Sequence, residues 1–202
     1  VLERLPVKVG EIVDQGQIVA KFDTTNAEAD YQEAKAQVAA LSAAMSRLTA
    51  ELFGTAPEFS DVTQEFPHFV KSQRLLFDRR QSAKNEEIAN LDAILALVRE
   101  EIQMNEPLLA RGDVSKTEIL RLQREEAELV AQQGKVKNDY FQSAQAEYNE
   151  TEEEFERVSQ LLIQRKKQLE GTTLSAPVKG IVKSIRLTTV GGVIRAGEDV
   201  LE

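Results

Sequence analysis

The uneven distribution of glycine constrains most strongly how this chain of 202 residues can fold. Seven of the ten glycines lie in residues 1–23 and 171–202, whereas residues 24–170 contain only three. Glycine interrupts regular secondary structure, so a segment with little glycine favours long elements. The middle of the chain is therefore expected to form long helices, and the two ends are expected to form short strands joined by turns.

The middle of the chain also repeats mostly apolar residues at alternating spacings of three and four. The pattern runs through Tyr31, Ala34, Val38, Leu41, Met45, Leu48 and Leu52, then through Ile88, Leu91, Leu95, Val98, Ile102, Asn105 and Leu109, and then through Phe141, Ala144, Tyr148, Thr151, Phe155, Val158 and Leu162. Such a repeat places one apolar stripe along each helix and is typical of a coiled coil. It predicts three helices, at about residues 24–53, 67–111 and 115–170.

Residues at the ends of these segments agree with helix boundaries. Gly54 follows the first segment, and Pro67 suits the first turn of the second, where its missing N–H is not needed. Gly112 suits the left-handed position after a helix. Ser115, followed three residues later by Glu118, is a capping box for the third helix.

The helix lengths limit how the segments can be arranged. At ~1.5 Å per residue the three helices are about 45, 67 and 84 Å long, so the first two end to end would exceed the third by roughly 28 Å. Residues 55–66 are therefore expected to form a loop that folds back. The prediction is three helices side by side near the base of a hairpin and two at its tip.

The two glycine-rich ends repeat each other. Residues 9–19 align without gaps with residues 190–200, and in each copy five residues separate two glycines. The pattern indicates a strand, a turn and a second strand. A single hairpin is marginally stable, so the two copies are expected to pair into one small β-sandwich with a pseudo-twofold axis. The expected turn glycines are Gly10, Gly16, Gly191 and Gly197.

These repeated ends resemble the split lipoyl domain of HlyD-type periplasmic adaptors, which are also called membrane fusion proteins. Residues 174–182 are similar to the family's entry into the second half of that domain. Residues 189–194 and 26–30 resemble the type I secretion branch. The resemblance implies a mainly α fold with a small β domain, in which a long helical hairpin is inserted between the two halves of a lipoyl-like β-sandwich.

The implied domains are the first lipoyl-like half at 1–23, the helical hairpin at 24–173 and the second lipoyl-like half at 174–202. The resemblance also implies a preceding transmembrane helix and a following β-barrel domain in the full protein. A chain that starts and stops in strand patterns is expected to be a fragment of such a protein.

The family's partner-binding motif lies at the hairpin tip. It consists of an arginine, a leucine four residues later and a serine seven residues after that. Leu108 and Ser115 match this pattern, whereas Met104 stands at the arginine position. The tip residues expected to bind an outer-membrane channel are Leu108, Leu109, Arg111, Gly112, Asp113, Val114, Ser115 and Ile119. The apolar members of this set could instead serve only to close the hairpin, and the sequence leaves both interpretations open.

Composition excludes several kinds of chemistry. The net charge of −9 argues against a nucleic-acid surface. With no cysteine and one histidine, the chain can form no disulfide, cysteine zinc site or multi-histidine metal site. Lys21 could suggest lipoyl or biotin attachment, but the hairpin that would carry such a lysine is where the helices are inserted. No catalytic residue, metal site or cofactor is therefore expected.

The family implies a structural role rather than catalysis. The expected function is a periplasmic adaptor of a Gram-negative bacterium that links an inner-membrane ABC transporter to a TolC-like outer-membrane channel for type I protein secretion. It would be anchored to the inner membrane by an N-terminal segment outside this sequence. Adaptors would associate into a ring, although the fragment alone is expected to be monomeric. The alternatives are a drug-efflux adaptor with the same fold, a plain coiled-coil protein and a carrier-domain enzyme component.

Overall fold

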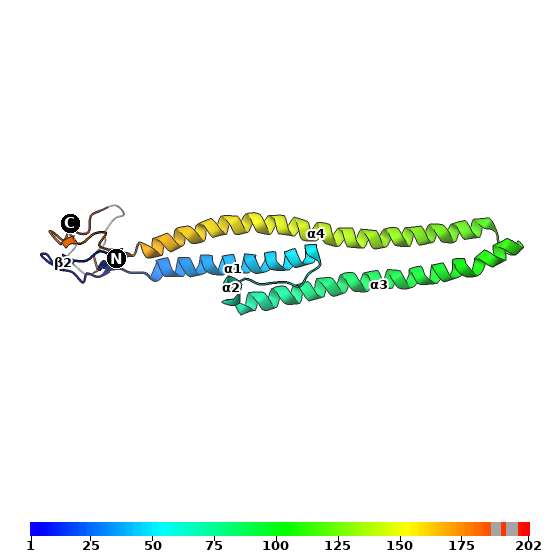
Figure 1. Ribbon diagram of the computed structural model, residues 1–202, viewed down its shortest axis with the longest axis horizontal. Coiled ribbons are helices and arrows are strands. Elements are labelled where there is room, and N and C mark those ends of the chain that lie inside the picture. Colours follow the sequence, from blue (N-terminus) through cyan, green and yellow to red (C-terminus); the bar gives the residue numbers. More distant parts are fainter. Residues whose placement is uncertain (187–190, 193–197) are drawn as a thin grey trace. The chain divides into compact units, whose positions relative to one another are not determined.

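The computed structural model describes residues 1–186, 191–192 and 198–202 (Figure 1). Along this part of the chain the elements are β1 (Leu2–Arg4), β2 (Ile12–Val13), β3 (Ile18–Phe22), α1 (Thr25–Phe53), α2 (Asp61–Gln64), α3 (Pro67–Arg111), α4 (Lys116–Glu170), β4 (Thr173–Ser175) and β5 (Gly180–Ile181). The structure is mainly helical with short antiparallel strands, so the expected fold class is confirmed. Gly197, one of the expected turn glycines, lies outside the described residues.

The long helices begin and end where residue chemistry permits. Pro67 occupies the first turn of α3, where a backbone N–H has no helical partner. Gly112 follows α3 with φ 84°, and Gly54 follows α1 with φ 68°. Both angles lie in the left-handed region that favours glycine. In the part of the chain that the structure describes, no helix has the length and apolar character that a membrane span requires.

Residues 55–66 contain a feature that the sequence analysis missed. Instead of a loop throughout, the segment includes the one-turn helix α2. The carbonyl of Ser60 accepts hydrogen bonds from both the N–H and the hydroxyl of Thr63, at 3.0 and 2.5 Å, and Thr63 is fully buried. A short polar turn gives no apolar period, so periodicity could not reveal it.

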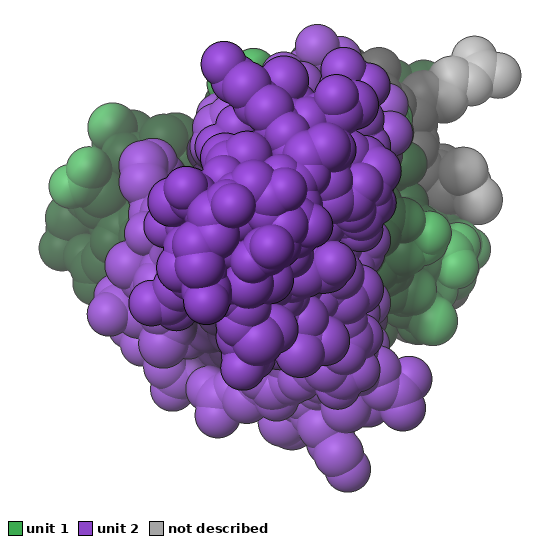
Figure 2. Space-filling model, turned by 90° about the vertical axis from the view of Figure 1, so that its right-hand side faces the viewer, with its two compact units in different colours: residues 1–38, 155–202 green, residues 39–154 purple. Residues whose placement is uncertain are grey.

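The chain divides into two compact units, which Figure 2 colours separately. The β unit consists of residues 1–38 and 155–202, and the hairpin unit consists of residues 39–154. The division passes through α1 and α4, so each of these helices contributes one part to each unit.

The β unit is built from strands of both chain ends. β3 lies in the middle of an antiparallel sheet in the order β1-β3-β4, and β2 pairs with β5 in a second sheet. The buried residues of its larger apolar cluster also come from both ends: Val7, Val13, Val19, Ala176 and Val182. Neither end has enough strands to bury its own apolar face, so each end needs the other.

The two ends exchange equivalent backbone hydrogen bonds. The N–H of Gly10 donates to the carbonyl of Val182 at 2.8 Å, and Val182 donates back to the residue after Gly10 at 2.9 Å. In the same way Gly191 donates to Leu2 at 2.9 Å, and Leu2 donates back to the residue after Gly191 at 3.0 Å. Gly10 and Gly191 have φ values of 87° and 88°. This reciprocity is what a pseudo-twofold relation between the halves requires.

The hairpin unit contains a two-helix part and a three-helix part. In the two-helix part α3 and α4 pack through a seam that includes buried Leu95, Val98 and Leu129. In the three-helix part, residues of α1 contact both α3 and α4. Phe141, which the periodicity placed on an apolar stripe, is 50% exposed instead. The neighbouring Tyr140 is half-buried, and the ammonium group of Lys84 makes a cation–π contact with its ring, 4.5 Å from the ring centroid.

Candidate functional site

The turn between α3 and α4 is a Schellman motif. The N–H of Gly112 donates to the carbonyl of Leu109 at 3.0 Å, and the N–H of Asp113 donates to the carbonyl of Leu108 at 2.9 Å. These bonds satisfy carbonyls that the end of a helix would otherwise leave without partners. The turn therefore has a defined backbone conformation, and it presents exposed side chains from Arg111 and Asp113.

The start of α4 fixes the other side of the turn. The hydroxyl of Ser115 accepts a hydrogen bond from the N–H of Glu118 at 3.2 Å, as expected for a helix cap. The Glu118 carboxylate accepts hydrogen bonds from Arg121 at 2.8 and 3.1 Å. These bonds hold the pKa of Glu118 below its ordinary value. Arg121 also lies 3.1 Å from Glu125, so the first turns of α4 carry a small surface ion-pair network.

The apolar tip residues are only partly available to a partner. Leu108, Leu109 and Val114 are half-buried, and Ile119 is buried in the seam. Part of their role is therefore to close the hairpin. Leu120, which does not continue the seam period and was not among the expected tip residues, is about half exposed. Met104, at the family's arginine position, is also exposed.

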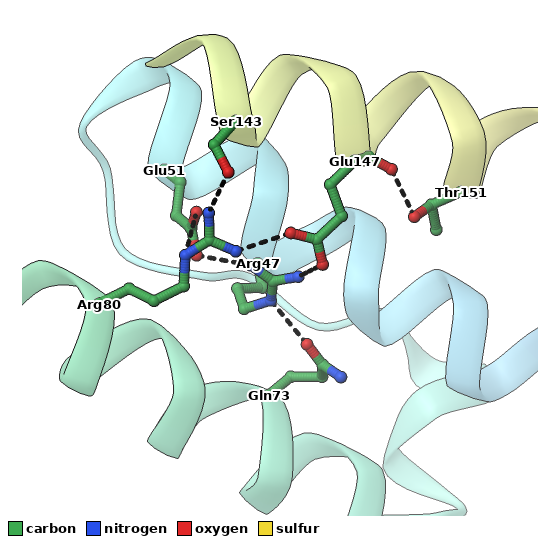
Figure 3. Close-up of polar contacts among 7 residues, drawn as sticks. All are labelled: Arg47, Glu51, Gln73, Arg80, Ser143, Glu147 and Thr151. Atoms are coloured by element: carbon green, nitrogen blue, oxygen red, sulfur yellow. Dashed lines mark hydrogen bonds and ion pairs between the residues drawn. The ribbon is translucent and has the colours of Figure 1, made fainter. Parts of the chain in front are cut away.

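A second polar constellation, which sequence analysis did not identify, holds the three-helix part together (Figure 3). Arg47 of α1 is only 1% exposed, and it bonds Glu51 at 2.6 Å, Gln73 of α3 at 2.7 Å and Glu147 of α4. Arg80 of α3 completes the cluster. It lies 2.6 Å from Glu147 and 3.4 Å from Glu51. Two arginines and two glutamates thus join three helices.

Burial and the charges of this cluster shift two pKa values, those of Glu147 and Tyr140. Burial alone would raise the pKa of Glu147, but hydrogen bonds and charge from Arg80 and Arg47 outweigh burial and hold that pKa below its ordinary value. Burial, together with the nearby Glu51 carboxylate, raises the pKa of Tyr140. The cluster therefore favours the ionised form of the Glu147 carboxylate, as a structural ion-pair network does.

The available sequence signal for this cluster was the pair Arg47 and Glu51, four residues apart on a helix rich in alanine. That spacing also occurs in ordinary exposed pairs, so it does not by itself indicate burial. Among the described residues, no group of three or more histidine, aspartate and glutamate side chains is placed to hold a metal ion.

Comparison with known proteins relates this geometry to other chains. No family model matches the chain. The type I secretion system membrane fusion protein PrsE of Rhizobium meliloti (strain 1021) is 22% identical over an alignment of 250 residues that covers all of this chain. Among solved structures, the soluble domain of LipC, a membrane fusion protein of a type I secretion system, matches with a TM-score of 0.69 and 21% identity. That match covers 99% of this chain and 94% of the LipC chain.

The chain has the fold of a membrane fusion protein. The resemblance to HlyD-type adaptors is confirmed, since both PrsE and LipC are membrane fusion proteins of type I secretion. The periplasmic adaptor protein EmrA also matches, with a TM-score of 0.49 and 17% identity over 99% of this chain and 67% of the EmrA chain. The chain spans 57% of the length of PrsE.

The membrane fusion protein fold accounts for both the β unit and the hairpin unit, because the match to LipC extends over nearly the whole chain. In this fold the hairpin turn lies at the end of the two-helix part. The turn is the point where α3 ends and α4 begins, and both of its helices extend far beyond the last residue of α1.

Proposed function

We propose that this chain is the adaptor section of a type I secretion system. In this proposal the protein lies in the periplasm, is anchored to the inner membrane, and links an ABC transporter to a TolC-like outer-membrane channel. Copies associate side by side in the assembled complex. Its role is mechanical rather than enzymatic.

The fold carries this proposal. A long hairpin that ends in a defined turn is inserted between the two paired ends of a β unit, and the same fold occurs in the LipC soluble domain. PrsE and LipC are both named for type I secretion, which favours secretion over the drug-efflux alternative. We further propose that residues 1–23 and 174–202 act as one lipoyl-like domain and that residues 24–173 form the helical domain. The turns of the lipoyl-like domain would contain Gly10, Gly16, Gly191 and Gly197.

The proposed channel-binding surface is the turn between α3 and α4. The exposed side chains of Arg111, Asp113 and Ser115 would supply polar contacts, since Met104 stands where the family has arginine. Half-buried Leu108, Leu109 and Val114 would supply an apolar edge, and Gly112 sets the backbone of the turn. Buried Ile119 would support this surface from below rather than touch the channel.

The absence of cysteine allows a direct test. Asp113→Cys, at an exposed position of the turn, is labelled in cells with a thiol-reactive photocrosslinker in the full-length protein. The proposal predicts that illumination captures an outer-membrane channel, which mass spectrometry identifies. Asn138→Cys, exposed on the middle of α4, is the matched control and should not capture the channel.

The two variants separate the possible outcomes. Capture by Asp113→Cys alone supports docking through the turn. Equal capture by both variants, or no channel captured by Asp113→Cys, contradicts it. In either contradictory case specific docking through the turn is rejected.

A further inference from the structure

Two four-residue spacings follow one another in the seam of α3, close to the level where α1 ends. The side chains of α3 that form the seam there are buried or half-buried at Phe77, Arg80, Lys84 and Ile88. From residue 88 to residue 109, by contrast, spacings of three and four alternate, as in an ordinary heptad seam. The heptad pattern of α3 is therefore interrupted at Lys84.

The same irregularity occurs on α4, at Val136, Tyr140 and Ala144. The two irregularities lie at the same height along the hairpin, because the ammonium group of Lys84 is 4.5 Å from the ring centroid of Tyr140. The guanidinium carbon of Arg80 is 5.8 Å from the same centroid. We call this level of the hairpin the Lys84–Tyr140 layer.

These spacings change the direction in which the two helices wind around each other. At about 100° per residue, a step of seven residues turns the seam by about −20°, whereas a step of eleven, from 77 to 88 or from 133 to 144, turns it by about +20°. A negative drift produces the left-handed supercoil of a heptad seam, and a positive drift opposes it. The supercoil is therefore locally unwound at the Lys84–Tyr140 layer, although both helices continue through it.

Side chains fill this layer less completely than they fill the apolar seam. A hollow of about 290 Å³ opens beside the layer, between residues 80–87 of α3 and residues 136–140 of α4. Among the described residues, the buried hydroxyl of Tyr140 has no hydrogen-bond partner. A region with few buried apolar contacts opens more readily than a close-packed one.

Gly134 adds a weak point to α4 in the same stretch. It lies inside the helix, and a Cβ added there would meet no heavy atom within 4 Å. Packing therefore does not require a glycine at this position. Glycine in a helix interior lowers the stability of that helix relative to alanine.

The layer also lies where the support from α1 ends. Glu51, in the last turn of α1, lies 3.4 Å from Arg80, which borders the layer. The last residue of α1, Phe53, is 76% exposed. On one side of the layer the buried ion cluster joins three helices, whereas on the other side α3 and α4 pack alone. The stiffness of the hairpin therefore changes abruptly at this level.

We propose that the Lys84–Tyr140 layer is a bending joint of the hairpin. The two-helix part tilts about this layer relative to the three-helix part, while α3 and α4 remain helical. An unwound supercoil, sparse packing and a change in the number of helices coincide there. This inference goes beyond the proposed function, because it concerns the hairpin itself and does not require that the turn bind a channel.

Distances between paired spin labels test the joint in a full-length protein otherwise free of cysteine. Gln132→Cys with Glu150→Cys places two labels on one face of α4 across the layer, because eighteen residues make five helical turns. Thr117→Cys with Lys135→Cys is the matched control, with the same spacing of about 27 Å within the two-helix part. All four positions are exposed. Double electron–electron resonance should give a distance distribution at least twice as wide across the layer as for the control pair.

Hydrogen exchange provides the second measurement. Backbone amides of residues 136–144 should exchange at least tenfold faster than those of residues 119–129, which belong to the same helix and include buried Ile119, Leu122 and Leu129. Either of two results would overturn the inference. Equally wide distance distributions indicate that the hairpin bends evenly or stays straight, and equal exchange indicates that the layer is packed as firmly as the apolar seam.

A substituted layer shows whether these side chains cause the bending. Lys84→Leu with Tyr140→Leu makes the layer apolar, so the distribution across it should narrow towards that of the control pair. Lys137→Leu, at an exposed position of the same helix, should leave the width unchanged. An unchanged width in the double variant, with native helix content by circular dichroism, contradicts the joint. If the double variant does not fold, the two label pairs in the natural sequence decide the proposal.

Discussion

The hairpin unit is held together differently in its two parts. Where α3 and α4 pack alone, the seam is apolar and includes Leu95, Val98 and Leu129. Where α1 joins them, Arg47 and Glu51 are buried and form ion pairs with the other two helices. A heptad seam offers similar packing at several registers, whereas a buried ion cluster satisfies its charges in one arrangement. We therefore expect the polar cluster to set where α1 sits and the seam to supply most of the hairpin's stability.

The largest expected effect comes from removing Arg47. Arg47→Met leaves the buried Glu51 carboxylate without its 2.6 Å partner, and breaking a buried ion pair in this way costs about 3–5 kcal/mol. The free energy of unfolding in urea, followed by circular dichroism, measures the loss.

The double variant Arg47→Met with Glu51→Leu is the control. It removes both buried charges of this pair, so it should recover much of the stability that the single variant loses. A single variant within about 1 kcal/mol of the natural protein would mean that the cluster is not what positions α1.

The apolar seam gives the second prediction through two leucines of one helix. Leu122 is 1% exposed and Leu120 is 51% exposed. Leu122→Ala should cost about 2–5 kcal/mol, because it leaves a cavity in the seam. Leu120→Ala should change the free energy of unfolding by about 0.5 kcal/mol or less, since it removes no buried contact. Urea unfolding compares the two, and equal effects would mean that Leu120 belongs to the core.

The contrast between the two parts also explains what sequence could reveal. Seam residues such as Leu95 and Leu129 follow a regular period, and Pro67 and Gly112 have clear conformational reasons for their positions. These local signals were sufficient to predict the helices. The pairing of the two chain ends was also accessible, because their glycine patterns repeat.

Contacts that depend on a third helix were not accessible from the same signals. Arg47 and Glu147 are a hundred residues apart, and nothing local distinguishes them from exposed charges. The exposure of Phe141 was also not accessible from periodicity. A heptad fitted through Ala144 places Phe141 on the seam, whereas the structure uses Tyr140 towards α3 and Ala144 as a buried position. The tip residues were found from resemblance, and their docking role stays a prediction.

The smallest expected effect is a pH dependence that the Glu147 carboxylate gives to the three-helix part. The pKa of Glu147 in the folded chain lies below its ordinary value of 4.5. A lowered pKa means that the ionised carboxylate stabilises the fold fully above the unfolded pKa, and this stabilisation is lost as the pH falls through the folded pKa. The Glu147 side chain is 40% exposed, so solvent screens the interaction and the change should be modest.

Urea midpoints measured from pH 7 down to pH 3 test this pH dependence. Glu147→Gln should flatten the profile at the acidic end relative to the natural protein, because the substituted side chain no longer titrates. Glu153→Gln, at an exposed position on the same helix, is the matched control and should follow the natural profile. A Glu147→Gln profile parallel to the natural one would mean that the cluster contributes through packing rather than charge, and the contrast between polar and apolar parts of the hairpin would lose its electrostatic basis.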